Sequence, residues 1–118
     1  MAYNEIPVNV REDREGDILV LEPQGRIDSS TAPLLGERLT AVLAGPGTRL
    51  VLDFRSLEYI SSAGFRVLLL AAKHAEKAES RLALCGITGK VRQLFDLAGF
   101  LDLLPIYASR EECVTSLR

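Results

Sequence analysis

The fold of this chain is decided by the stretch Leu50-Val51-Leu52-Asp53-Phe54-Arg55-Ser56-Leu57-Glu58-Tyr59-Ile60-Ser61-Ser62-Ala63-Gly64-Phe65. Its first residues form a near-continuous apolar run, which predicts a strand over 49–54 that is covered on both faces. Two serines follow a short loop, and the Leu- and Ala-rich run after them predicts a helix from Ser62 to about Ala78. A hydroxyl at the first turn of such a helix faces unpaired backbone N–H groups and the positive end of the helix dipole. A phosphate there would leave the fold intact and would change the charge of the surface sharply.

Turn and cap signals divide the rest of the chain into strands and helices. Gly45-Pro46-Gly47 ends a helix that starts after Ser29-Ser30-Thr31, and Gly99 suits the end of a later helix. The spacing from Ser109 to Glu112 is that of a capping box. The other predicted elements are an edge strand at 6–10, a charged turn at 11–16, a strand at 18–23 that continues through 24–28, a strand at 81–85, a helix at 90–98, a short strand at 103–107 and a last helix ending near 117.

The order of these elements is β-β-α-β-α-β-α-β-α. It predicts an α/β fold in which one mixed sheet of four to five strands is packed with about four helices. A length of 118 residues suits one compact domain. We therefore expect a single domain over residues 1–118, with its core at about 18–117.

The composition is that of an ordinary globular protein, with 47% apolar and 25% charged residues and a formal net charge of −2. No run of Lys or Arg forms a basic stripe, so nucleic acid is not expected as a partner. The longest apolar-rich run, 65–72, is interrupted by Arg66 and is too short to span a membrane. Because no signal-peptide core is seen near the N-terminus, we expect a cytoplasmic protein without a membrane partner, with Cys85 and Cys113 as reduced thiols.

The residue content leaves little for catalysis. The one histidine, His74, lies three turns along the helix that begins at Ser62, too far away to act as its base. The acidic residues show no spacing typical of metal ligands. We therefore expect no catalytic residue, no metal and no cofactor. On position alone, Ser61 and Ser62 each suit an N-cap of the helix.

The strand and the Leu/Ala helix that flank Leu57-x-Tyr59-Ile60-Ser61-Ser62-Ala63-Gly64-Phe65 are accompanied by four further segments. These are Gly25-Arg26-Ile27-Asp28, Arg81-Leu82-Ala83-Leu84, the run at 91–99 and Pro105-Ile106-Tyr107. Taken together and in this order, the five segments resemble the STAS domain of bacterial anti-sigma factor antagonists. The likeness extends from about residue 18 to residue 117.

The resemblance implies a modification site at the start of the long helix. In the family, the loop before this helix reads Asp-Ser-Ser/Thr-Gly, and its first serine is phosphorylated. Placed on this chain, the Asp falls on Ser61, the phosphorylated serine on Ser62, the next residue on Ala63 and the glycine on Gly64. The resemblance thus implies phosphorylation of Ser62, with Ser61 as the second choice.

Three neighbouring residues complete the switch loop and partner-binding surface that the resemblance implies. Asp28 falls on the family's Asp after the early strand, near the phosphorylation loop, where it orients that loop or assists the hydroxyl. Arg66 stands where the family often has a small residue, which alters the partner surface. Phe65, one turn into the helix, is either a core residue or a partner contact.

The resemblance also implies a function and its partners. In the family, the unphosphorylated protein binds an anti-sigma factor, a GHKL-type ATPase and serine kinase, and so frees the sigma factor. That kinase phosphorylates the antagonist and expels it, and a metal-dependent serine phosphatase resets it. The antagonist itself is not an enzyme, and we expect a monomer. The alternative is a STAS module that binds a small molecule or nucleotide within a signalling assembly.

Overall fold

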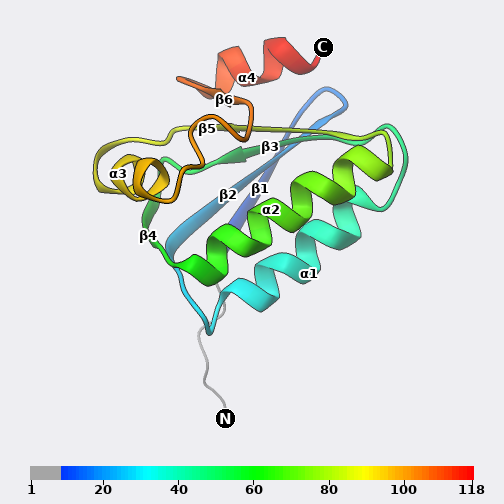
Figure 1. Ribbon diagram of the computed structural model, residues 1–118. Coiled ribbons are helices and arrows are strands. Elements are labelled where there is room, and N and C mark those ends of the chain that lie inside the picture. The colour runs from blue at the N-terminus through cyan, green and yellow to red at the C-terminus, as the bar shows by residue number, and fades with distance from the viewer. Residues whose placement is uncertain (1–8) are drawn as a thin grey trace.

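The computed structural model describes residues 9–118, in which a central sheet carries helices on both faces (Figure 1). The described sheet has six strands, which are β1 (Asn9–Glu15), β2 (Ile18–Ile27), β3 (Arg49–Asp53), β4 (Leu57–Ile60), β5 (Arg81–Cys85) and β6 (Ile106–Tyr107). The helices are α1 (Ala32–Leu43), α2 (Ser62–Lys77), α3 (Gly89–Leu97) and α4 (Arg110–Leu117). This is the mixed α/β architecture with four helices that the sequence predicts.

The strands lie in the order β1-β2-β3-β5-β6, and β4 pairs with β2 beside the end of β3. β1 and β2 form an antiparallel hairpin, and all other pairs are parallel. Parallel neighbours need a crossover connection. Here α1 connects β2 to β3, α2 lies in the connection from β3 to β5, and α3 connects β5 to β6. α1 and α2 lie side by side on one face, and α4 lies on the other (Figure 1).

The central strands are apolar on both faces because both faces are covered. Side chains alternate along each strand, so two separate clusters form. The cluster under α1, α2 and α3 takes Leu19 and Leu21 of β2, Leu50 and Leu52 of β3 and Leu82 and Leu84 of β5. The cluster under α4 takes the residues between them, which are Ile18, Val20, Val51, Ala83 and Cys85. The near-continuous apolar runs in the sequence thus contribute alternate residues to two hydrophobic clusters, one on each face of the sheet.

The prediction of a charged turn at 11–16 is wrong, because Arg11 to Glu15 belong to β1 and only Gly16-Asp17 form the turn. β1 is the outer strand of the sheet, and most of its side chains are exposed. Charged residues are common on such edges, where they oppose pairing with other chains. The remainder of the predicted edge strand, 6–8, lies outside the described residues.

The sixth strand, β4, occupies a segment for which the sequence predicts a loop. β2 is long enough for two partners, and its first half pairs with β3 while its second half pairs with β4. The register shifts between Gly25 and Arg26, and Gly25, at φ 82°, donates its N–H to the carbonyl oxygen of Ser56. A four-residue strand with a distant partner has no local signal, so the sheet exceeds the predicted four to five strands.

β6 is shorter than the predicted strand at 103–107. Its ladder to β5 begins where Leu84 donates its N–H to the carbonyl oxygen of Pro105, at 2.8 Å. The next rung of this parallel ladder requires an N–H from residue 105, and proline has none. The ladder therefore stops at Ile106, although proline itself is tolerated at an edge.

α4 is fixed to the sheet through Arg110 in its first turn. The guanidinium contacts one carboxylate on each of three strands: Asp13 at 3.1 Å, Glu22 at 3.0 Å and Asp53 at 3.0 Å. Glu22 and Asp53 are only 5% and 1% exposed, so Arg110 neutralises charge inside the protein. Burial disfavours the charged guanidinium, but the hydrogen bond to Asp53 and the three carboxylate charges prevail and raise the pKa of Arg110.

Candidate functional site

The two serines at the start of α2 differ in their surroundings. Ser61 is the N-cap, and its Oγ accepts a hydrogen bond from the N–H of Gly64 at 3.4 Å. Its own N–H donates to the carbonyl oxygen of Ile27 at 2.8 Å, which joins the start of α2 to the end of β2. Ser62 is the first residue of the helix and is exposed, and its Oγ forms no hydrogen bond to residues 9–118. Capping therefore belongs to Ser61, and the hydroxyl of Ser62 is open to solvent.

Ser62 borders an open hollow of about 320 Å³ between the N-terminal ends of α1 and α2. Ser29 and Pro33 line it from the α1 side, and Ala63 and Arg66 line it with Ser62 from the α2 side. The structure thus brings together three of the residues that the sequence singles out. Ser29 is an addition, because only the parallel packing of α1 against α2 places the two helix starts beside each other.

The electrostatics of this hollow favour an anion. The first turn of α2 contains no acidic residue, and its free N–H groups carry the positive end of the helix dipole. Arg66 lies four residues after Ser62, so the two side chains are neighbours on the helix surface. Arg66 is exposed and forms no ion pair within residues 9–118. A phosphate on Ser62 would find a free cation one turn away.

Asp28 organises the turn between β2 and α1. Its Oδ1 accepts hydrogen bonds from the N–H of Ser30 at 3.0 Å and of Thr31 at 3.2 Å, and from the Ser30 hydroxyl at 2.7 Å. These bonds, the Ser30 hydroxyl first, lower the pKa of Asp28 despite slight desolvation. The carboxylate forms no bond to Ser62 in the structure, so its contribution to the site is to hold Ser29 and the start of α1 in place.

We expect Asp28→Ala to lower the melting temperature at neutral pH, since the turn loses its acceptor, and Asp28→Asn to lower it less. The pKa of Asp28 is depressed in the folded state, so its stabilisation is present above the unfolded value of about 3.8 and disappears as the pH falls through the lower folded value. Thermal melts of the three proteins from pH 7 to pH 2 test this. A deficit of Asp28→Ala that stays constant to pH 2 would show that the charge plays no part.

Gly64 and Phe65 lie in the core instead of on the surface. A Cβ on Gly64 would stand 2.6 Å from Ile60 and 2.8 Å from Ile27, so only glycine lets α2 approach β2 and β4 this closely. Phe65 is 8% exposed and packs against Phe95 and Phe100, with ring centroids 4.9 and 4.8 Å apart. Of the two roles that the sequence leaves open for Phe65, the structure displays core packing.

The outer face of α2 carries two exposed leucines that sequence reasoning does not single out. Leu69 is 37% exposed and Leu70 is 53% exposed, and both follow Ser62 and Arg66 along the same side of the helix. The sequence does contain a signal for these exposed leucines. Phe65, Leu68, Ala71 and Ala75 form the buried stripe of α2, and their helical spacing places Leu69 and Leu70 on the opposite side.

Comparison with known proteins agrees with this description. The chain is 37% identical over 106 residues to BtrV of Bordetella bronchiseptica, which carries the name of an anti-sigma factor antagonist, and the match covers 90% of this chain and 91% of that one. It is 33% identical over 106 residues to the anti-sigma-B factor antagonist of Bacillus subtilis, covering 90% and 94%. The crystal structure of an anti-sigma factor antagonist from Mycobacterium paratuberculosis matches with a TM-score of 0.81 at 23% identity, over 94% of each chain.

The family is established by sequence as well as by fold. Residues 9–113 match the STAS domain, from the first described strand into α4. The two relatives each match over 106 residues, at 37% and 33% identity, and the fold includes every segment on which the resemblance rests. This chain belongs to the STAS domain family.

Proposed function

We propose that this protein is an anti-sigma factor antagonist whose binding is switched by phosphorylation of Ser62. The observation that carries the proposal is the exposed hydroxyl of Ser62 in the first turn of α2, beside the cap at Ser61 and the exposed guanidinium of Arg66, neither of which has a side-chain partner among residues 9–118. The names of the relatives support the class of partner. In the unphosphorylated state the protein binds an anti-sigma factor and so releases a sigma factor.

The start of α2 tolerates a phosphate on Ser62 without rearrangement. A phosphoryl group adds about −1.5 to −2 charges and three acceptor oxygens. The free N–H groups and the dipole of α2 stabilise an exposed anion at this place by roughly 0.3–1 kcal/mol. Arg66 adds a charge-assisted partner from the next turn. The fold therefore stays the same, and the surface changes its charge.

The partner surface in this proposal is the exposed side of α2. Arg66, Leu69, Leu70 and Lys73 follow Ser62 on it, so exposed apolar side chains lie between two cations. Such a surface suits an apolar patch with acidic residues at its rim. A phosphate on Ser62 then meets those acids, and one charge change converts attraction into repulsion without a large movement.

The transfer step is a phosphoryl transfer from ATP to Ser62. The Oγ of Ser62 forms a bond to the γ-phosphorus while the bond to the β-phosphate oxygen breaks, ADP leaves, and the hydroxyl proton passes to a base of the kinase. The kinase is the anti-sigma factor itself, of the GHKL ATPase type, and a serine phosphatase reverses the modification. In this proposal the antagonist performs no catalysis and acts as a cytoplasmic monomer, with residues 18–117 as the core of a single domain.

A segment that crosses a membrane is not found in the described part of the chain: none of the helices within residues 9–118 is long and apolar enough. The same residues contain no group of three or more His, Cys, Asp or Glu side chains that could hold a metal ion.

Ser62→Ala is expected to bind the anti-sigma kinase and to stay bound in the presence of ATP, because the acceptor hydroxyl is missing. The test incubates the purified protein with the GHKL-type kinase of the same organism and ATP, and follows the complex by size-exclusion chromatography. Wild type should dissociate and become phosphorylated, while Ser61→Ala, the matched control, should do the same. Full phosphorylation of Ser62→Ala would move the site to another residue, and the absence of any complex would refute the proposed partner class.

A further inference from the structure

The edge of β5 is covered over only half of its length. β6 pairs with Leu84 and Cys85, and its ladder stops there because Pro105 has no N–H for the next rung. The preceding residues of β5, 81–83, have β3 on one side and, within residues 9–118, no strand on the other. A short open edge therefore remains between α2 and α4.

The backbone of Leu82 points out of this open edge. Arg81 donates its N–H to the carbonyl oxygen of Thr48, and the carbonyl oxygen of Cys85 accepts from the N–H of Phe54. The backbone groups of the odd-numbered residues of β5 therefore point toward β3. Leu84 bonds toward β6, and the alternation of a parallel ladder turns the N–H and the carbonyl of Leu82 in the same direction. Neither group has a hydrogen-bond partner within the described residues. Buried backbone groups are nearly always paired, so this pair is an unfilled donor and acceptor.

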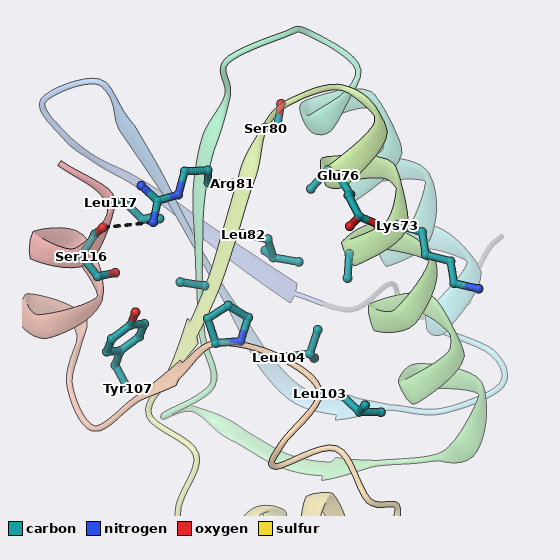
Figure 2. A pocket seen from close by; sticks show the side chains of 14 residues that line it. Lys73, Glu76, Ser80, Arg81, Leu82, Leu103, Leu104, Tyr107, Ser116 and Leu117 are labelled. Atoms are coloured by element: carbon teal, nitrogen blue, oxygen red, sulfur yellow. Dashed lines mark hydrogen bonds between the residues drawn. The ribbon is translucent and has the colours of Figure 1, made fainter.

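Leu82 is one of the residues that line a hollow of about 400 Å³, whose lining side chains are shown in Figure 2. Lys73 and Glu76 of α2 lie on one side of β5, and Tyr107 and Ser116 lie on the other. The volume falls in the range of about 300–1,000 Å³ that is typical of ligand sites. Leu104, which is buried, and Leu103, which is 60% exposed, supply apolar wall and rim.

We propose that this hollow binds an extended peptide segment of a partner protein, which adds to β5 at Leu82. An extended backbone offers the N–H and C=O pair that Leu82 lacks, and strand addition at an open edge is a common mode of peptide recognition. The side chains on either side of the added residue meet apolar walls. The rim of the hollow carries two cations, Lys73 and Arg81, and one acid, Glu76, so its net charge is positive. This charge favours a peptide with an acidic residue beside its apolar ones.

This site is separate from the switch at Ser62. Lys73 lies eleven residues beyond Ser62, about 16 Å along α2, and the two hollows share no lining residue. Lys73 is the one residue of the peptide site that also belongs to the partner surface of α2 described above. The peptide site therefore stands or falls independently of the proposed phosphorylation. It gives the protein a second contact that a phosphate on Ser62 leaves intact.

The test selects binders from a phage-displayed library of random dodecapeptides and maps them by amide hydrogen exchange. In the free protein, the N–H of Leu82 should exchange faster than those of Ala83 and Leu84. The selected peptides should carry alternating apolar residues with an acidic neighbour, and they should slow exchange at Leu82 at least tenfold. N-methylation of the peptide N–H that donates to the carbonyl oxygen of Leu82 should abolish binding, because it removes the backbone donor.

Three variants separate the outcomes. Ala72→Arg fills the hollow from α2 and should weaken the selected peptides at least tenfold, while Ala41→Arg, on the exposed side of α1, should leave them unchanged. Ser62→Asp should also leave them unchanged. The proposal is overturned if no peptide is enriched, if protection appears away from Leu82, or if the N-methylated peptides bind equally well, since the last result would describe an apolar pocket without strand addition.

Discussion

Replacing Arg110 by methionine is expected to destabilise the protein by about 3–5 kcal/mol, because it leaves the buried Glu22 without its cation and leaves the buried Asp53 paired only with the exposed Arg55. Methionine keeps much of the volume of the side chain, so the loss reports the charge and not a cavity. A change of this size lowers the melting temperature by roughly 10 °C or more. Thermal and urea unfolding of the two proteins measure it.

Two controls show whether the buried carboxylates are the cause. Arg14→Met removes an exposed arginine of β1 that forms no ion pair within residues 9–118, and it should change the stability by less than about 0.5 kcal/mol. Adding Glu22→Gln to Arg110→Met removes the buried charge that has lost its cation and should recover part of the loss. If Arg110→Met were as stable as Arg14→Met, the three ion pairs would not be what holds α4 on the sheet.

Ser62→Asp is expected to weaken binding to the anti-sigma factor by about 100-fold or more while the melting temperature barely changes. A negative charge that faces like charges across an interface costs several kcal/mol, and each 1.4 kcal/mol is tenfold in affinity. The fold is spared because an acid is favourable in the first turn of a helix. Titration calorimetry and thermal melts provide the two measurements.

Ser62→Asn and Thr115→Asp are the matched controls for this prediction. Ser62→Asn has nearly the shape of the aspartate without its charge, so it should bind within about tenfold of wild type. Thr115→Asp adds the same charge on exposed α4, on the other face of the sheet, and should not affect binding. Equal weakening by Ser62→Asn and Ser62→Asp would mean that shape and not charge controls the interface. Unfolding of Ser62→Asp would refute the argument from the helix terminus.

The start of α2 could be predicted from the sequence because its signals are local. The apolar strand, the serine pair and the Leu/Ala run place the helix start at Ser62, where the structure has it. The same signals leave Ser61 and Ser62 open as the cap, and the structure assigns the cap to Ser61. The central strands β2, β3 and β5 could also be predicted, because strands that are covered on both faces appear in the sequence as continuous apolar runs.

The features that the sequence misses depend on distant partners. β4 exists because the second half of β2 is free to pair, and nothing within its four residues indicates this. Asp53 fits a turn acceptor at a strand end and does accept the N–H of Arg55, but its pairing with Arg110 joins residues 57 positions apart. Pro105 lies within the predicted strand at 103–107, and its effect on the ladder appears only when the register of β6 on β5 is known.

The candidate site shows the same division. The exposed Ser62 and Arg66 are close because they are four residues apart on one helix, and this proximity can be predicted from the sequence. Ser29 joins them only through the packing of α1 on α2, and the burial of Phe65 depends on Phe95 and Phe100 from another part of the chain. Local chemistry is therefore predictable here, and the surface that a partner meets is not.

The most direct test of the switch is the intact mass, with site mapping, of wild type, Ser61→Ala and Ser62→Ala recovered from the native cell. We expect one added phosphoryl group on wild type and on Ser61→Ala, and none on Ser62→Ala. The account is contradicted if the group persists on Ser62→Ala, or if no form of the protein is phosphorylated in growth, starvation or stress.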